Sequence, residues 1–258
     1  MPLGFGSNSL LFDFDGLIAI NRVGDLRQAL NGLPDSAETQ NCVLKVGAGQ
    51  SLQHIAIATS RMGWRGLEFA AGIPATVGGA VCSNAGAHGQ EMSSVVTEVS
   101  IMDSEALGIT HHRPKEDGWK WGYRCLELPC PNGCITEVSI SLDADPRAKG
   151  RVEDILARRR ATQPMLPSAG CIFKNPPTGE SAGSLLERAG MKGVSVGGAC
   201  ISGQHANFFV NSTRTADPDD FLRLITLARD AVWKQSAVLL QLEVKVVKQG
   251  NVLTSLDV

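Results

Sequence analysis

Apolar residues recur at helical spacing in three segments of this chain. The pattern predicts helices over residues 51–62, 182–189 and 217–234, where apolar positions three and four residues apart form one face. Ser51 is a suitable N-cap for the first helix, and Gly63 is placed to end it. The inner face of the long third helix is expected to consist of Phe221, Leu224, Ile225, Ala228, Val232 and Trp233.

Other segments have the apolar pattern of strands. We predict strands over residues 95–102, 134–142 and 239–247, because apolar and polar positions alternate there. A further short apolar strand is expected within residues 167–176, where it is held between turns.

Residues 143–151 contain a proline, a glycine and several charged residues, which is typical of a connection between domains. We therefore predict two domains, 1–145 and 146–258. A basic helix is expected over residues 152–162. Its arginines are expected to face solvent, and the alternative is contact with an anionic ligand.

Glycines are concentrated in residues 72–89, which read GIPATVGGAVCSNAGAHG. Such a density suggests a surface where a ligand needs bare backbone N–H groups, and a phosphate-bearing cofactor is the natural occupant. A second glycine turn in residues 3–11 suits a dinucleotide. The run at residues 72–89 has the spacing of neither a Rossmann turn nor a P-loop. The alternative for residues 72–89 is tight turns between short buried strands, and for residues 3–11 it is an ordinary turn.

The composition excludes several classes of protein. The chain has 258 residues, 43% hydrophobic and 19% charged, with a net charge of −2. These values are typical of a globular protein with no nucleic-acid partner. The sequence has no apolar stretch long enough to cross a membrane and no signal peptide, so we expect a cytoplasmic protein with no membrane partner.

The seven cysteines are scattered, and none forms a C-x-x-C pair. We expect reduced thiols and no metal site. Zinc binding by Cys125, Cys130 and Cys134, with His111 and His112 upstream, is the alternative.

Eight motifs occur in the order of one known enzyme family: the GSN turn, GIPxTVGGA with NAGAxG, YR, RRxxxQP, PSAGxxFKNP, AGxLxExAGxKG, HANFxVN and LxxEV. In these motifs, across nearly the whole chain, the sequence resembles the UDP-N-acetylenolpyruvoylglucosamine reductase (MurB) family. The resemblance implies a two-domain α+β flavoenzyme. Residues 1–145 would be an FAD-binding domain of the vanillyl-alcohol-oxidase type, and residues 146–258 a substrate-binding domain.

The family uses FAD and NADPH to reduce the enolpyruvyl group of a UDP-sugar, which yields UDP-N-acetylmuramate for peptidoglycan. By resemblance, the FAD site takes four positions from the opening turn and eight from the glycine-rich run. They are Gly4, Gly6, Ser7, Asn8, Gly72, Ile73, Thr76, Gly78, Gly79, Asn84, Gly86 and Ala87.

The resemblance also implies three catalytic residues. Arg124 would hold the substrate carboxylate and offset the charge that develops on it. Glu243, expected in its neutral form, would share in polarising the enolate. Cys171 stands where the family more often has a serine, and its thiol would donate the proton, since a thiol is a far stronger acid than an alcohol. From the residues alone, each has an ordinary structural reading: a surface arginine, a strand-edge carboxylate and a space-filling thiol.

Four further positions match substrate contacts of the family: Tyr123, Gln163, Lys174 and Asn175. The substrate partner would be a UDP-sugar, and we expect a monomer. Members normally have a strand, a helix and a strand before the GSN turn, so we also expect that the N-terminal part of the FAD domain is missing.

Two alternatives remain at this point. One is a non-catalytic, UDP-sugar-binding relic that cannot retain FAD. The other is a different FAD oxidoreductase of the same fold, in which His88 or Cys82 would tether the flavin.

Overall fold

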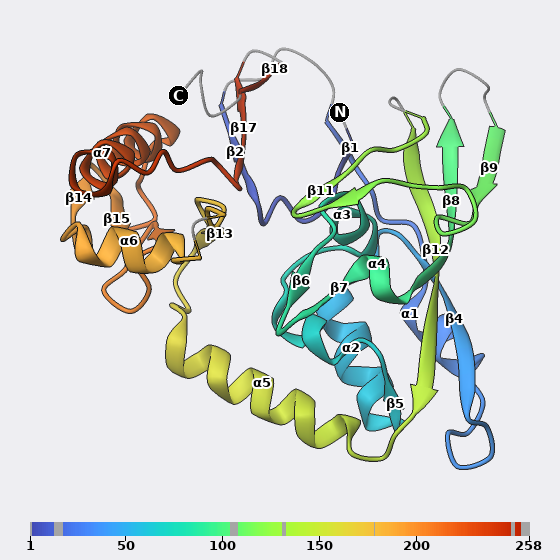
Figure 1. Cartoon of the computed structure of the whole chain (residues 1–258). Coiled ribbons are helices and arrows are strands. Elements are labelled where there is room, and N and C mark those ends of the chain that lie inside the picture. Colours follow the sequence, from blue (N-terminus) through green and yellow to red (C-terminus); the bar gives the residue numbers. More distant parts are fainter. Residues whose placement is uncertain are drawn as a thin grey trace. The chain divides into compact units, whose positions relative to one another are not determined.

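The computed structural model describes residues 2–12, 18–103, 108–130, 133–177, 179–248 and 251–253. The chain divides into two compact units (Figure 1). Unit 1 consists of residues 1–5 and 18–159, and unit 2 of residues 6–17 and 160–258. Each unit contains helices and strands, in agreement with the predicted α+β class.

Unit 1 is built on an antiparallel sheet with the order β4-β12-β8-β9. The strands are β4 (Asn41–Gly47), β12 (Cys134–Ala144), β8 (Val96–Asp103) and β9 (Gly108–His112), and the two-residue β5 (Trp64–Arg65) pairs with the end of β12. Strands β8 and β12 confirm two of the predicted strands.

Short helices accompany this sheet. They are α1 (Leu26–Asn31), α2 (Leu52–Arg61), the 3-10 helix η1 (Glu68–Gly72), α3 (Val77–Cys82) and α4 (Met92–Val95). Helix α2 begins and ends as predicted, because the Ser51 side chain accepts a hydrogen bond from the His54 N–H and Gly63 has a φ of 81°. Leu52 and Ile55 on its inner face are fully buried, so α2 is held by core packing as well as by its caps.

Three pairs of two-residue strands complete the described part of unit 1. Strand β1 (Pro2–Leu3) runs parallel to β3 (Ala19–Ile20), β6 (Gly86–Ala87) pairs with β7 (Gln90–Glu91), and β10 (Trp121–Gly122) pairs with β11 (Cys125–Leu126).

The predicted connection at residues 143–151 is more ordered than its composition suggests. Asp143 and Ala144 belong to β12, and α5 (Ala148–Thr162) begins shortly afterwards. Asp145 is buried between them and accepts hydrogen bonds from the guanidinium groups of Arg147 and Arg151. The units defined by contacts divide after Arg159, because α5 packs with unit 1. The division into functional domains at 145/146 stays a prediction.

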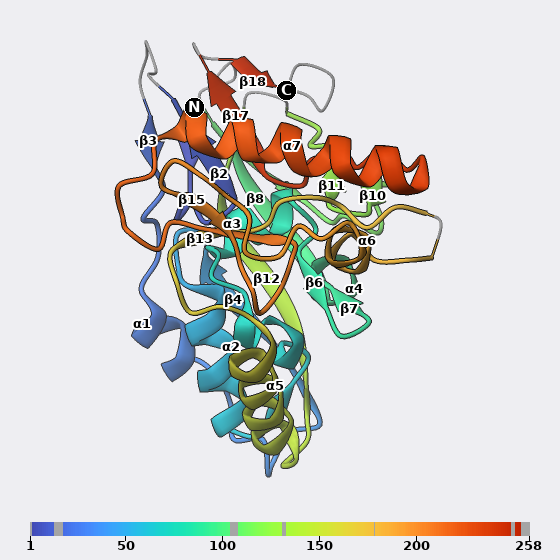
Figure 2. The ribbon, with the colours of Figure 1, turned by 90° about the vertical axis from the view of Figure 1, so that its left-hand side faces the viewer.

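Unit 2 contains a sheet with the order β13-β16-β15-β14, formed by β13 (Ser168–Cys171), β16 (Phe208–Val210), β15 (Ala199–Ile201) and β14 (Ser195–Val196). Helix α7 (Pro218–Ser236) packs on β14 and β15 and contacts α6 (Ala182–Arg188); Figure 2 shows α7 along its length. A second sheet has the order β18 (Asn251–Leu253), β17 (Lys245–Lys248) and β2 (Ser9–Leu11).

The predictions for the last helix and the last strand need correction. Five of the six expected inner residues of α7 are buried, but Trp233 is 52% exposed. At 100° per residue, Trp233 lies about 100° beyond Val232 and leaves the buried stripe. Residues 239–244 form a single bridge, Phe173 with Leu242, and the regular strand is confined to β17.

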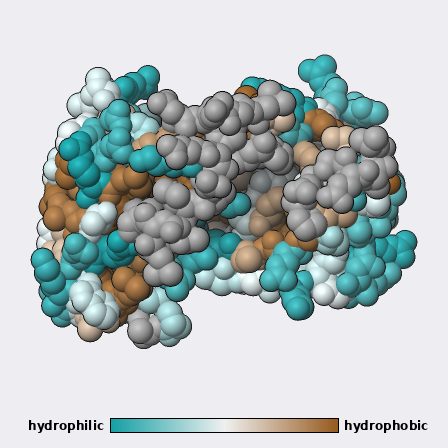
Figure 3. Space-filling model, turned by 90° about the horizontal axis from the view of Figure 1, so that it is seen from above, coloured by the Kyte–Doolittle hydropathy of each residue, from teal (hydrophilic) through white to brown (hydrophobic). Residues whose placement is uncertain are grey.

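Large apolar side chains also reach the surface, and Figure 3 shows hydrophobic residues among hydrophilic ones on the face seen from above. Such scattering is normal for globular proteins. Within the described residues, no helix has the length and apolar character to cross a bilayer.

Candidate active site and cofactor surface

The residues predicted for the site are divided between the two units. Unit 1 contains Gly4, Gly72, Ile73, Thr76, Gly78, Gly79, Asn84, Gly86, Ala87, Tyr123 and Arg124. Unit 2 contains Gly6, Ser7, Asn8, Gln163, Cys171, Lys174, Asn175 and Glu243.

The glycines at the start of α3 allow close packing. The N–H of Gly78 donates to the Ala48 carbonyl at 2.9 Å, and the N–H of Gly79 donates to the Thr76 hydroxyl at 3.2 Å. A Cβ on Gly78 would lie 2.9 Å from the Ala48 Cβ, closer than side chains normally approach. The expectation of bare N–H groups is therefore wrong at these two glycines, because both groups bond to protein.

The two glycine-rich segments meet in unit 1. A Cβ on Gly4 would overlap the side chain of Thr76, the residue that caps α3. Further along the same run, a Cβ on Gly72 would lie 2.9 Å from the Cδ of Arg159. Gly4 and Gly72 are thus positions where a side chain would displace a neighbour, which explains the choice of glycine.

The opening turn has the donor groups that a phosphate needs. Gly6 has a φ of 67°, and among the described residues no hydrogen bond uses the N–H groups of Gly6, Ser7 or Asn8. Successive N–H groups around a left-handed residue form a concave anion-binding surface. The side chain of Asn8 donates to the Glu243 carbonyl at 3.2 Å, which fixes the end of the turn. These residues fit a dinucleotide such as FAD.

Arg124 occupies a tight turn in unit 1. Tyr123 and Arg124 connect β10 to β11, and Arg124 has a φ of 58°, in the left-handed region. Its Nη2 donates to the Gly86 carbonyl at 3.0 Å, and its guanidinium carbon lies 5.0 Å from the centroid of the Tyr123 ring. The structure thus brings the predicted catalytic arginine to the end of the glycine-rich run.

Cys171 and Glu243 come together in unit 2. Cys171 ends β13, and the next residue, Ile172, accepts a hydrogen bond from the Glu243 N–H at 2.8 Å. Both Cys171 and Glu243 are half-buried. Gly170 has a φ of 78°, and a Cβ there would lie 3.9 Å from the Ser7 carbonyl oxygen. The thiol-bearing strand, the carboxyl-bearing segment and the opening turn are therefore neighbours.

The predicted substrate contacts of unit 2 differ in their surroundings. Lys174 continues the segment after Cys171, and its N–H donates to the Gln241 carbonyl at 2.8 Å. The side chain of Asn175 accepts from the Ala182 N–H at 3.0 Å, so it helps to begin α6. The Oε1 of Gln163 is buried without a hydrogen-bond partner among the described residues, which leaves it able to accept from a ligand.

Asn207 and His205 fix the segment that follows Cys171. Asn207 is 2% exposed, and its amide bonds both the N–H and the carbonyl of Phe173, at 2.9 and 2.8 Å. Nδ1 of His205 accepts from the Asn207 N–H at 3.2 Å, and burial lowers the pKa of this histidine. These contacts of His205 and Asn207 are packing contacts within unit 2.

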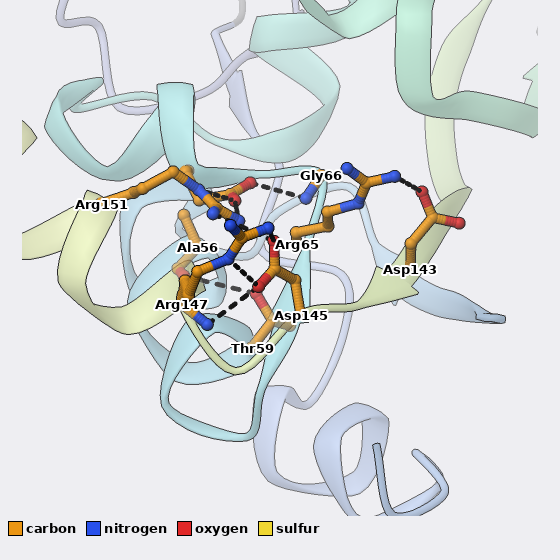
Figure 4. Close-up of polar contacts among 9 residues, drawn as sticks. Ala56, Thr59, Arg65, Gly66, Asp143, Asp145, Arg147 and Arg151 are labelled. Atoms are coloured by element: carbon orange, nitrogen blue, oxygen red, sulfur yellow. Dashed lines mark hydrogen bonds and ion pairs between the residues drawn. The ribbon is translucent and has the colours of Figure 1, made fainter. Parts of the chain in front are cut away.

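Sequence reasoning missed a polar network around a cavity of unit 1. The cavity has a volume of about 540 Å³, and Arg65, Glu68, Phe69, His88 and Arg151 are among the residues that line it. Figure 4 shows part of this network. The sequence feature that could have revealed this network is Glu68 within the apolar run LEFAAG, because a carboxylate is rarely buried without a partner.

The groups of this network are paired with one another. Arg151 donates two hydrogen bonds to Glu68, at 2.9 and 2.6 Å, and one to Asp145 at 3.0 Å. Arg65 donates to Asp143 at 3.0 Å. Bonds from Arg147 and Arg151 hold the pKa of Asp145 well below its ordinary value. The pairing satisfies these charges within unit 1 and marks the network as structural.

Comparisons with known proteins agree with these features. The FAD binding domain family matches residues 1–110, and the C-terminal domain of UDP-N-acetylenolpyruvoylglucosamine reductase matches residues 162–247. The UDP-N-acetylenolpyruvoylglucosamine reductase of Protochlamydia amoebophila (strain UWE25) is 38% identical over 248 residues, which cover 95% of this chain and 78% of that protein.

Two further similarities span most of the chain. UDP-N-acetylenolpyruvoylglucosamine reductase 2 of Symbiobacterium thermophilum is 39% identical over 95% of this chain and 76% of its own length. The crystal structure of UDP-N-acetylenolpyruvylglucosamine reductase (MurB) from Thermus caldophilus has a TM-score of 0.79 and 34% identity, and covers 96% of this chain and 85% of that one. By fold and by sequence along nearly its whole length, the chain belongs to the UDP-N-acetylenolpyruvoylglucosamine reductase family.

Proposed function

We propose that this chain reduces UDP-N-acetylenolpyruvoylglucosamine to UDP-N-acetylmuramate with FAD and NADPH, a step in the synthesis of peptidoglycan precursors. Family membership supports the reaction. One observation carries the assignment of residues: in unit 2, the Glu243 carbonyl accepts a hydrogen bond from the Asn8 side chain and the Glu243 N–H donates to the Ile172 carbonyl, so that this segment joins the opening turn to the strand of Cys171.

The residues of the opening turn are suited to hold the FAD diphosphate. The N–H groups of Gly6, Ser7 and Asn8 supply donors to its oxygens, which supports this position over the paired N–H groups of Gly78 and Gly79. When bound, FAD accepts electrons from NADPH and supplies them to the double bond of the enolpyruvyl group.

Arg124 is proposed to bind the substrate carboxylate. A guanidinium offers paired donors in a plane, which matches the two oxygens of a carboxylate. The charge is in place before the reaction, so it stabilises the negative charge that develops next to the carboxylate without rearrangement. Tyr123, half-exposed beside it, is proposed to contact the substrate.

Cys171 and Glu243 are proposed to complete the reduction. The Cys171 S–H bond breaks as a new C–H bond forms at the carbon next to the carboxylate, and the thiolate regains its proton from solvent. A protonated Glu243 donates a hydrogen bond to the enolate oxygen. Gln163, Lys174 and Asn175 are proposed contacts of the UDP-sugar, with the lysine at a phosphate.

The visible spectrum of the purified protein tests this function. The protein is incubated with FAD, freed of unbound cofactor, and mixed anaerobically with NADPH and then with the UDP-enolpyruvyl sugar. We expect the flavin to stay bound, to bleach with NADPH and to recover its colour with the sugar. Flavin that bleaches but does not recover with the sugar would rule out the proposed substrate, and protein that holds no flavin would rule out the proposed enzyme.

We further propose that the enzyme works in the cytoplasm as a monomer, with no nucleic-acid or membrane partner. The net charge of −2 supports the absence of polyanion binding. Light scattering coupled to size-exclusion chromatography tests the monomer, and a mass of twice 27.3 kDa would contradict it.

A further inference from the structure

The turn that carries Arg124 is held in a conformation that an arginine rarely adopts. Arg124 has a φ of 58°, which brings the Cβ of an L-residue close to its own backbone. A hairpin of two-residue strands offers little to stabilise such a turn by itself. The surrounding structure must therefore fix it, as is common for strained residues at functional sites.

Asn84 is the residue that reaches this hairpin from the glycine-rich run. It is fully buried, and its Nδ2 donates to the Gly122 carbonyl at 3.1 Å, directly before the turn. Its Oδ1 accepts from the Ser93 N–H at 3.1 Å. Both polar atoms of this buried amide are therefore hydrogen-bonded within the protein.

The same short segment also holds the arginine side chain. Gly86, two residues after Asn84, accepts the hydrogen bond from Arg124 Nη2 at 3.0 Å. Residues 84–86 therefore contact the hairpin twice, once at the backbone before the turn and once at the guanidinium. Asn84 itself has a φ of 42°, so the segment is also shaped by a left-handed residue.

From these contacts we propose that Asn84 is a positioning residue for Arg124 and is not a ligand of FAD. This inference rests on the proposed role of Arg124. Through Gly122, Asn84 fixes the backbone of the turn, and the arginine is thereby aimed at the substrate carboxylate before the substrate binds. A displacement of about 1 Å at such a group lowers reaction rates by about 100-fold.

The near-isosteric variant Asn84→Asp tests the proposal. It keeps the acceptor for Ser93 but places a carboxylate oxygen against the Gly122 carbonyl, where two acceptors repel each other. The matched control is Thr59→Val, which also removes hydrogen bonds from a buried polar side chain of unit 1. If Asn84→Asp fails to fold, Asn84→Gly replaces it, because glycine accepts the positive φ.

Three quantities are measured for each variant: bound flavin per protein, the rate of flavin reduction by NADPH, and the rate of flavin reoxidation by the UDP-enolpyruvyl sugar. We expect Asn84→Asp to keep its flavin and its reduction rate, and to lose about 10- to 100-fold in reoxidation. Thr59→Val is expected to lose thermal stability and to keep both rates.

A double-mutant cycle separates positioning from general damage. If Asn84 acts through Arg124, the Asn84→Asp/Arg124→Gln double variant reoxidises no more slowly than Arg124→Gln alone. Loss of flavin from Asn84→Asp would make it a cofactor ligand, and additive effects would make it a separate structural residue, so either result overturns the proposal. Unchanged reoxidation in Arg124→Gln alone would instead refute the proposed role of Arg124.

Discussion

At the scale of single residues, the thiol of Cys171 is the most distinctive group of the proposed site. It ends β13 beside the segment of Glu243, where many members of the family are expected to carry a serine. A cysteine elsewhere in a core would be exchangeable for alanine at a modest cost in packing. Because Cys171 is proposed to donate a proton, its replacement by serine and its replacement by alanine are expected to have different effects on the reaction.

We predict that Cys171→Ser keeps flavin reduction by NADPH and much of the turnover, because a hydroxyl can still deliver a proton. Cys171→Ala is expected to keep flavin reduction and to lose the reaction with the UDP-enolpyruvyl sugar by at least about 100-fold. Stopped-flow absorbance of the flavin measures both half-reactions. A Cys171→Ala variant that is slowed only in flavin reduction would contradict the role.

At the scale of elements, the helices were more predictable than the strands. Capping residues and apolar spacing identified α2, α6 and α7, because these signals lie within a few residues of one another. The two-residue strand pairs and β2 were not predicted, since β2 pairs with β17 more than 200 positions away and no local pattern records that. The buried ion pairs of Asp145 were not predicted. Its partners, Arg147 and Arg151, lie around the start of α5, but the composition of this segment is typical of a connection between domains.

The packing of α3 gives a prediction at this scale. Gly78→Ala places a Cβ 2.9 Å from the Ala48 Cβ and is expected to lower the free energy of unfolding by about 1–3 kcal/mol. Gly150→Ala is the matched control, because nothing lies within 4 Å of its Cβ and it is inside α5. That exchange should raise the free energy of unfolding by about 0.5–1 kcal/mol. Urea unfolding measures both, and equal effects would refute the packing argument.

The connection between β12 and α5 gives a pH dependence. Bonds from Arg147 and Arg151 lower the pKa of Asp145 in the folded protein, so the unfolded chain takes up a proton first as the pH falls. The stabilisation is fully present above the unfolded pKa of about 3.9, starts to be lost as the pH falls below that value, and is gone only once the pH has fallen through the lower folded pKa. The melting temperature of Asp145→Asn should therefore lie below that of the parent at pH 7, and the gap should shrink at pH 4 and below. A constant gap would contradict this linkage.

At the scale of the whole molecule, the opening segment contributes to both units. Gly4 packs on Thr76 in unit 1, and β2 pairs with β17 in unit 2. The proposed catalytic roles rest on the motifs of the family, since Arg124 and Glu243 look ordinary from their neighbours in sequence. No motif indicated which glycine-run N–H groups are hydrogen-bonded within the protein. Those of Gly78 and Gly79 are, whereas among the described residues no hydrogen bond uses those of the opening turn.

Removal of residues 1–12 should affect both units. We expect faster amide hydrogen exchange at Lys245–Lys248, which lose their pairing with β2, and at the start of α3, where Gly4 no longer covers Thr76. Hydrogen exchange followed by mass spectrometry measures this, with α2 as an internal reference expected to change little. Acceleration confined to one of the two regions would contradict the shared role of the segment.

The pairing of β2 with β17 has a consequence for biosynthesis. Strand β2 leaves the ribosome more than 200 residues before Lys245–Val247, its parallel partners. Until these partners are synthesised, β2 has an open edge of unpaired N–H and C=O groups, of the kind that recruits other chains. Unit 2 therefore cannot finish folding until Lys245–Val247 have been synthesised. The yield of folded protein in the cell should depend on chaperones that shield nascent strands.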